Sequence, residues 1–209
     1  MHFRDRAAAG QELAQALSEF AGRRDVVLMA LPRGGVPVAA EVARALALRL
    51  DVIPVRKLGV PGHEECAMGA IAQGDLYFLD QQVVSEQELT ETQVDHVMAQ
   101  EQAELQRRCR LYRSQRSIPD LSRHTVVVID DGLATGTTMR VAVAALEQAH
   151  SHEIVVAVPV GETETCREIE TIVGRLICPH QLSPFYSVGS WYDDFSQVTD
   201  AEVVKMLHR

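Results

Sequence analysis

Two adjacent carboxylates, Asp130 and Asp131, are the side chains of this sequence that most directly indicate chemistry. They follow a run of four apolar residues, 126–129, and precede a loop rich in Gly and Thr, 132–138. Carboxylates accept hydrogen bonds from sugar hydroxyls and can hold the water shell of a magnesium ion. The pair therefore predicts a site for a hydroxyl-bearing group.

The loop after the two acids has the features of a phosphate site. A helical pattern begins at Met139, so a buried strand, a loop of small residues and a helix start follow one another. In that arrangement backbone N–H groups converge, the helix dipole adds partial positive charge, and threonine hydroxyls donate hydrogen bonds. A phosphate beside a hydroxyl-binding pair describes a ribose 5-phosphate. A generic strand–loop–helix junction is the alternative, although paired acids have no obvious use there. The residues assigned to the phosphate are Leu133, Ala134, Thr135, Gly136, Thr137 and Thr138.

A second glycine turn, Arg33-Gly34-Gly35, follows another apolar run at residues 26–31. Because it lies between a predicted buried strand and a predicted helix, 36–48, it is an anion site of the same physical type. The alternative is a tight turn with an exposed arginine.

Arg56 and Lys57 follow a predicted strand at residues 51–55. Two cations at the carboxyl end of a strand would lie on the edge where open α/β sheets bind ligands. Side-chain alternation sends Arg56 to the opposite face, so Lys57 is the better candidate for an anion contact. The alternative is a solvated surface pair.

These candidate sites need a common scaffold, and the order of the apolar segments predicts one. Apolar runs alternate with helical patterns and short loops, which is typical of an α/β fold with a doubly wound, mainly parallel sheet. The binding edge of that sheet would bring together Arg33, Lys57 and the two aspartates. The predicted strands are 26–31, 51–55, 126–129, 153–160 and 175–178.

Length and composition are those of one globular domain. The 209 residues can bury a sizeable core, and 46% hydrophobic against 23% charged residues is an ordinary balance. The net charge of −9 argues against a nucleic-acid partner and against an anionic membrane. The four cysteines are scattered, which is typical of free thiols and not of a disulfide framework or a zinc site. With no signal peptide and no apolar run of spanning length, we expect a cytoplasmic location.

The stretch 126–138 resembles the phosphoribosyl diphosphate (PRPP) motif of the type I phosphoribosyltransferases. Together with the opening residues 3–6, the turn at 32–35 and the aromatic tail at 185–192, it resembles a bacterial group of predicted phosphoribosyltransferases over nearly the whole chain. The resemblance implies a magnesium-dependent glycosyltransferase of the pentosyltransferase class, active in nucleotide metabolism. Such an enzyme transfers 5-phosphoribosyl from PRPP to a nitrogenous base or similar acceptor and releases pyrophosphate. It also implies a homodimer whose partners are small-molecule substrates.

The same resemblance implies roles for the candidate residues. Asp130 and Asp131 would hold the ribose hydroxyls as catalytic residues, with Lys57 as the third. Magnesium would be held mostly by substrate oxygens and water, to which the two aspartates could add. Ala134 stands where enzymes for 6-oxopurines usually carry an aspartate, which disfavours such an acceptor and leaves its identity open. The residues implied for pyrophosphate are Arg33, Gly34, Gly35 and Lys57.

Residues 57–75 are predicted to be a flexible flap, because glycines punctuate a stretch with few helix or strand signals. Enzymes of the family close such a flap over the reacting sugar. Glu64 and Glu65 are its candidates for the acceptor site, and solvated loop acids are the alternative. A hairpin of 68–72 with 76–79 is also predicted, and a capping-box pattern at 85–88 predicts a long surface helix over about 86–113.

The C-terminal segment, about 179–209, carries five of the chain's ten aromatic residues. The resemblance implies a hood, built from the chain termini, that binds the acceptor. A hydrophobic clasp that holds the last helix on the core is an equal alternative. With core, flap and hood together, we expect residues 1–209 to form a single phosphoribosyltransferase-like domain. The candidate stacking residues are Phe185, Tyr186, Trp191 and Tyr192.

Two functions stay open at this point. The first is the transferase, and the second is a PRPP- or nucleotide-binding regulator of the same fold without turnover. Regulators of this fold commonly carry a DNA-binding domain or a basic face, which this acidic sequence does not predict. Lys57 and the complete turn at residues 33–35 favour the enzyme.

Overall fold

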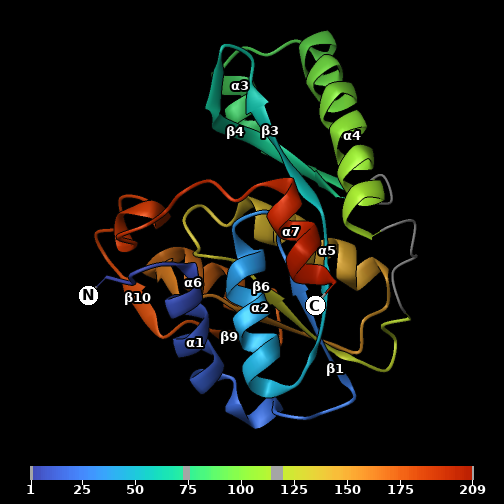
Figure 1. The fold of residues 1–209 in the computed structure, drawn as a ribbon. Coiled ribbons are helices and arrows are strands. Elements are labelled where there is room, and N and C mark those ends of the chain that lie inside the picture. The colour runs from blue at the N-terminus through green and yellow to red at the C-terminus, as the bar shows by residue number, and fades with distance from the viewer. Residues whose placement is uncertain (1, 73–75, 114–119, 209) are drawn as a thin grey trace.

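A computed structural model describes residues 2–72, 76–113 and 120–208, and its centre is a five-stranded sheet of order β2-β1-β6-β7-β9. Each pair of neighbouring strands in this sheet is parallel. The predicted α/β fold with a mainly parallel sheet is therefore confirmed (Figure 1). The strands are β1 (Val26–Ala30), β2 (Arg49–Val52), β6 (Thr125–Ile129), β7 (Glu153–Ala157) and β9 (Arg175–Ile177).

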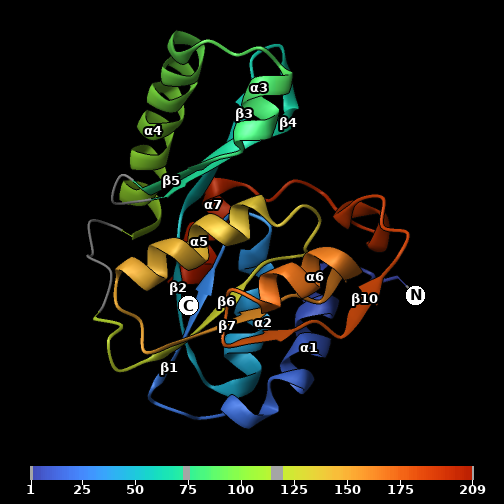
Figure 2. The ribbon, with the colours of Figure 1, turned by 180° about the vertical axis from the view of Figure 1, so that it is seen from behind.

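Helices cover both faces of this sheet (Figures 1 and 2), which explains why β1 and β6 are apolar at nearly every position. Val26 and Leu28 pack with the apolar side chains of one helical layer, whereas Val27 and Met29 pack with those of the other. The first layer holds α1 (Arg6–Ala16), α2 (Gly35–Leu46) and α7 (Asp200–Leu207), and the second holds α5 (Thr137–Gln148) and α6 (Thr163–Glu170).

An antiparallel sheet of order β3-β4-β5 is inserted between β2 and β6 and projects from one end of the core (Figure 1). Its strands are β3 (Val55–Val60), β4 (His63–Ala72) and β5 (Leu76–Leu79), followed by α3 (Gln81–Glu86) and α4 (Glu91–Arg113). Leu58 and Met68 of the sheet pack against Val94 and Leu105 of α4. The predicted hairpin of residues 68–72 with 76–79 is confirmed by the pairing of β4 with β5.

The structure corrects the prediction of an irregular flap at residues 57–75. Most of the described part of this stretch is paired strand, with β3 antiparallel to β4. Gly69 shows why glycines in this stretch do not indicate a loop. A Cβ at this position would lie 2.2 Å from the carbonyl oxygen of Phe78 on β5. The glycine therefore permits a close approach of two strands, although in sequence it reads as a loop signal.

The strand predicted at 51–55 and the helix predicted from 86 also need correction. The parallel strand β2 ends at Val52, so Arg56 and Lys57 belong to β3 of the inserted sheet. The long helix begins at Glu91, where Thr90 and Gln93 form the capping contacts, and Glu88 has a left-handed backbone with φ 50°. The pattern at 85–88 lies instead at the end of the separate short helix α3.

The N-terminus and the tail meet beside the main sheet. Phe3 forms a parallel bridge with Tyr192, and a two-stranded sheet joins β8 (Val160–Glu162) to β10 (His180–Leu182). The run predicted as one strand at 153–160 is thus divided between β7 and β8. Two short 3-10 helices, η1 (Ser18–Phe20) and η2 (Val188–Trp191), complete the described elements. Among these, no helix is long and apolar enough to cross a membrane, and all four cysteines are free thiols.

Candidate functional site

The predicted phosphate loop lies at the carboxyl end of β6, as expected. Gly136 adopts φ 73° and caps α5, whose first-turn N–H groups have no acceptor within the helix. Leu133 fixes the start of the loop, because its N–H donates to the Val160 carbonyl (2.9 Å) and its carbonyl accepts from the Glu162 N–H (2.8 Å). The hydroxyl oxygens of Thr135 and Thr137 lie 3.3 Å apart. The loop is therefore anchored at its first residue and keeps its hydroxyls at the helix start.

The two aspartates before this loop have different surroundings. Asp131 is 9% exposed, and Arg6 Nε donates to its Oδ2 over 2.8 Å. Asp130 is half-buried, and its Oδ1 accepts from the N–H of Asp131 over 2.8 Å. Burial, and then the nearby Asp131 carboxylate, raise the pKa of Asp130 well above its ordinary value. Burial also raises the pKa of Asp131, while Arg6 opposes that shift.

Arg6 is the site residue that the sequence reasoning missed. Its guanidinium carbon lies 3.8 Å from the ring centroid of Phe195, and its Nη1 donates to the Ser196 carbonyl over 2.8 Å. One side chain at the start of α1 thus joins the acid pair to the tail. The only signal in the sequence is the opening segment 3–6, which supported the family resemblance without indicating a role.

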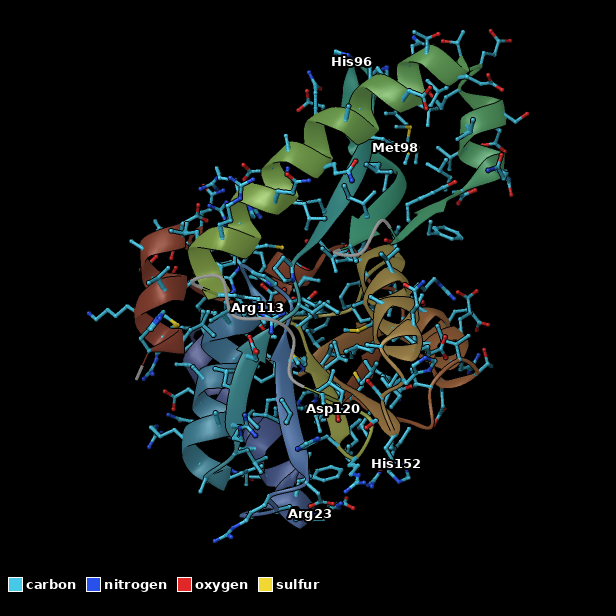
Figure 3. All side chains as sticks on the ribbon, turned by 90° about the vertical axis from the view of Figure 1, so that its right-hand side faces the viewer. Arg23, His96, Met98, Arg113, Asp120 and His152 are labelled. Atoms are coloured by element: carbon cyan, nitrogen blue, oxygen red, sulfur yellow. The ribbon has the colours of Figure 1, made fainter. Side chains whose placement is uncertain are left out.

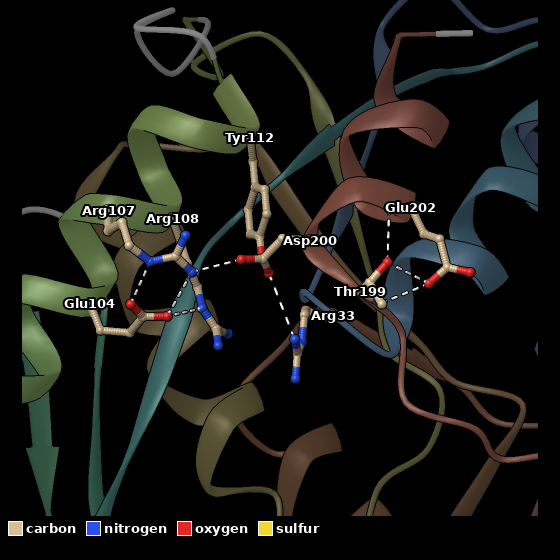
Figure 4. Close-up of polar contacts among 8 residues, drawn as sticks. All are labelled: Arg33, Glu104, Arg107, Arg108, Tyr112, Thr199, Asp200 and Glu202. Carbon is tan, nitrogen blue, oxygen red and sulfur yellow. Dashed lines mark hydrogen bonds and ion pairs between the residues drawn. The ribbon is translucent and has the colours of Figure 1, made fainter.

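The turn after β1 meets the acid pair, as the sheet topology predicts. β1 and β6 are neighbours, and a Cβ on Gly34 would lie 2.1 Å from Asp131 Oδ2. A Cβ on Gly35 would lie 2.6 Å from the Ile129 carbonyl oxygen. Only glycine allows so close an approach. The peptide bond between Pro32 and Arg33 is cis, and the Arg33 guanidinium forms an ion pair with Asp200 at 3.8 Å (Figure 4).

Lys57 and Glu64 belong to the inserted sheet, in β3 and β4. They line a cavity of about 680 Å³ between the β3–β4 hairpin and α4, together with His96 and the Arg56–Glu101 ion pair. The lining of this cavity includes neither aspartate of the acid pair. Figure 3 shows His96 near the end of α4 that lies away from the main sheet, whereas Arg113 lies at the other end. Lys57 lies within β3 and not at the end of a parallel strand, and its approach to the acids stays a prediction. The side chain of Glu65 lies outside the described part of the chain.

The tail aromatics mainly pack on one another and on the N-terminus. Tyr192 is 6% exposed, its hydroxyl donates to the Asp131 carbonyl over 2.5 Å, and its ring contacts Phe3. Phe185 stacks on Trp191 with centroids 6.2 Å apart. Tyr186, by contrast, is 86% exposed. Tyr192 thus packs on the N-terminal segment, and its apolar cluster includes no described residue of α7, so it does not form the predicted clasp on the last helix. The stacking role of the other three stays a prediction.

A mainly parallel α/β sheet, with an acid pair and a Gly/Thr loop at one strand end and a glycine turn at the neighbouring one, matches the fold of the type I phosphoribosyltransferases. Residues 3–187 match the family described as phosphoribosyl transferase domain, and the chain belongs to that family.

Known proteins extend this relationship over the whole chain. The crystal structure of TT1426 from Thermus thermophilus is 37% identical, with a TM-score of 0.79 over 99% of this chain and 98% of that one. AQ2163 from Aquifex aeolicus is 11% identical, with a TM-score of 0.52 over 97% and 85% of the two chains, which supports the fold alone. Rv0571c of Mycobacterium tuberculosis H37Rv, named as a candidate phosphoribosyl transferase, is 39% identical over 207 residues. Those residues are 99% of this chain and 46% of that protein, so the chain spans about half the length of this curated relative.

Proposed function

We propose that this chain transfers the 5-phosphoribosyl group of PRPP to a nitrogenous base or similar acceptor and releases pyrophosphate. The observation that carries the proposal is the close approach of Gly34 to Asp131, because the turn that we assign to an anion thereby adjoins the acid pair that we assign to hydroxyls. Family membership supports a transferase of this general kind. The anionic and hydroxyl-bearing parts of PRPP match the chemistry of these two neighbouring segments.

Each part of the site has a task in this reaction. The backbone N–H groups and hydroxyls of residues 133–138 hold the 5′-phosphate at the start of α5. Asp130 accepts hydrogen bonds from ribose hydroxyls, and its carboxylate stabilises the positive charge that develops at the anomeric carbon. The turn at Arg33 takes the pyrophosphate, with backbone N–H groups and a guanidinium suited to phosphate oxygens. These contacts favour the separated charges of the transition state over the bound substrate.

A magnesium ion fits this set of residues. The described residues hold no cluster of three or more His, Cys, Asp or Glu side chains that could bind a metal, and Asp131 is already engaged by Arg6. Asp130 then remains as an oxygen ligand, and substrate oxygens and water would supply the others. When bound, the ion neutralises the charge of the leaving pyrophosphate.

The remaining expectations belong to this proposal. A homodimer in the cytoplasm, acting in nucleotide metabolism on small molecules, is consistent with the family. Ala134 disfavours a 6-oxopurine acceptor, and Phe185, Tyr186 and Trp191 are the candidate contacts for its base. We also retain Lys57 as a candidate pyrophosphate contact and Glu64 as a candidate for the acceptor site, both in the inserted sheet.

The test is pyrophosphate release from PRPP and magnesium in the presence of a pool of bases. We expect release with at least one base, its loss in Asp130→Asn, and its retention in Asp25→Asn, which removes an exposed acid ahead of β1. PRPP binding without release from any pool would favour the regulator. Absence of PRPP binding would reject the transferase and a PRPP-binding regulator.

A further inference from the structure

Asp200 joins three segments that are distant in the sequence (Figure 4). It is the first residue of α7, and its Oδ1 accepts from the Tyr112 hydroxyl of α4 over 2.5 Å. Its Oδ2 accepts from Arg107 Nη2, also of α4, over 2.7 Å. Its third partner is Arg33 in the turn after β1, at 3.8 Å from Oδ1. A single carboxylate thus connects the last helix, the inserted segment and the turn that we assign to pyrophosphate.

The three partners hold this carboxylate unequally. Tyr112 is 2% exposed and makes a short hydrogen bond, whereas 3.8 Å to Arg33 is beyond hydrogen-bond distance. Thr199 and Glu202 form a complete capping box that fixes the start of α7. The Tyr112 hydrogen bond, and then Arg107, hold the pKa of Asp200 below its usual value, so the carboxylate stays charged. Asp200 is therefore fixed, and Arg33 is the partner that can leave.

Arg33 has a stronger alternative partner in the proposed reaction. A guanidinium binds phosphate oxygens through paired, charge-assisted hydrogen bonds, which are stronger than a loose ion pair with one carboxylate oxygen. We propose that Asp200 is a positioning residue that holds the Arg33 side chain while the site lacks pyrophosphate and competes with pyrophosphate for it. This inference rests on the proposed function. Asp200 then lowers the affinity of the site for pyrophosphate and so favours the departure of this product.

The experiment measures pyrophosphate binding, with magnesium present, by calorimetry on four proteins: the wild type, Asp200→Asn, Arg33→Gln and the double variant. Asn retains an oxygen for Tyr112, so the anchor on α4 is largely kept. We expect Asp200→Asn to bind pyrophosphate about three- to fivefold more tightly, the range that a part-exposed ion pair provides. Arg33→Gln should bind about tenfold more weakly, because it loses charge-assisted hydrogen bonds.

The double variant separates competition from a general charge effect. Competition for Arg33 predicts that Asp200→Asn has no effect once Arg33 is replaced, so the double variant should match Arg33→Gln. Simple repulsion between Asp200 and pyrophosphate would tighten binding equally in both backgrounds and would overturn the proposal. Glu202→Gln is the matched control, since it removes a charge from the same helix without touching Arg33. It should bind pyrophosphate as the wild type does.

Steady-state kinetics add a readout that a merely structural role would not change. The inhibition constant of pyrophosphate should fall in Asp200→Asn, with the unfolding midpoint close to that of Glu202→Gln. Weaker or unchanged pyrophosphate binding in Asp200→Asn, beside weak binding in Arg33→Gln, would overturn the role of Asp200 and leave the proposed function standing. A wild-type protein that binds neither pyrophosphate nor PRPP would remove the proposed function itself.

Discussion

At the scale of single residues, Asp130 carries a charge that its surroundings in the folded protein disfavour. Burial and the Asp131 carboxylate raise the pKa of Asp130 in the folded protein. A raised carboxyl pKa contributes stability that is fully present below the unfolded pKa of about 4 and is lost as pH rises through the folded pKa. Asp130→Asn should therefore raise the free energy of unfolding at neutral pH by about 1–2 kcal/mol, a modest value because Asp130 keeps some solvent contact.

Urea unfolding at two pH values checks this prediction. The gain from Asp130→Asn should be present at neutral pH and should vanish near the unfolded carboxyl pKa of about 4. Asp25→Asn, at an exposed ion pair, should change the free energy of unfolding by less than about 0.5 kcal/mol. A gain that persists unchanged at the lower pH would mean that the charge of Asp130 is not its cause.

Arg6 stabilises the folded protein, in contrast to Asp130, because its positive charge compensates the buried carboxylate of Asp131. The side chains of Arg6 and Asp131 are 11% and 12% exposed, so Arg6→Gln leaves a carboxylate with little access to water. We expect a loss of about 2–4 kcal/mol in the free energy of unfolding at neutral pH. Adding Asp131→Asn should restore part of it, because the uncompensated charge is then removed. Chemical denaturation of the two single variants and the double variant gives the coupling energy, and strictly additive effects would argue against the pair.

The residues in these two predictions also show which parts of the candidate site could be predicted from the sequence alone. The two acids, the loop after them and the glycine turn could be selected as candidates from the sequence, because each lies within a few consecutive residues. Arg6 could not, because it reaches Asp131 across 125 positions of the chain. The contacts of Asp200 with Arg33 and Tyr112 could not be predicted either, because they depend on how three elements pack.

At the scale of elements, the inserted sheet depends on Gly69. A Cβ there would lie 2.2 Å from a backbone oxygen of β5, which cannot move without breaking the pairing of β4 with β5. Gly69→Ala should therefore lower the free energy of unfolding by about 2–3 kcal/mol. Gly62→Ala, in open space with φ +79°, should cost only about 1 kcal/mol for its left-handed backbone. Denaturant unfolding of both variants tests whether Gly69→Ala loses more unfolding free energy than Gly62→Ala. Equal losses would show that the loss in Gly69→Ala does not come from the close approach of the two strands.

The same hairpin shows which elements could not be predicted correctly. Glycine was taken as a loop signal, but at Gly69 the absence of a side chain permits close packing between strands. The strand predicted at 51–55 also ends earlier, at Val52, so Lys57 belongs to β3 and its predicted place beside the acids stays untested. The parallel strands were predicted well, since β1 and β6 are buried on both faces and their apolar runs are continuous.

At the scale of the whole molecule, both ends of the chain close on the acid pair. Phe3 donates its N–H to the Trp191 carbonyl over 2.8 Å and packs on Tyr192, while Arg6 bonds Asp131 and Ser196. The sequence predicted a hood from the termini only through resemblance. In the structure the N-terminal segment and the tail are held to the acid pair by polar contacts at Asp131, so their stability and that of the candidate site are linked.

The Tyr192 hydroxyl tests this link, because it is the tail's hydrogen bond to the Asp131 carbonyl. Tyr192→Phe keeps the ring contact with Phe3 but leaves a buried carbonyl without that donor, which should cost about 1–2 kcal/mol of unfolding free energy. Tyr186→Phe is the matched control, since the Tyr186 side chain is 86% exposed and should tolerate the change. We expect proteolysis of the native protein within residues 183–198 to be faster in Tyr192→Phe alone, and PRPP to slow it in the wild type by ordering the loop that carries Asp131. Equal cleavage in both variants would mean that the aromatic clasp, and not the hydrogen bond at the acid pair, holds the tail in place.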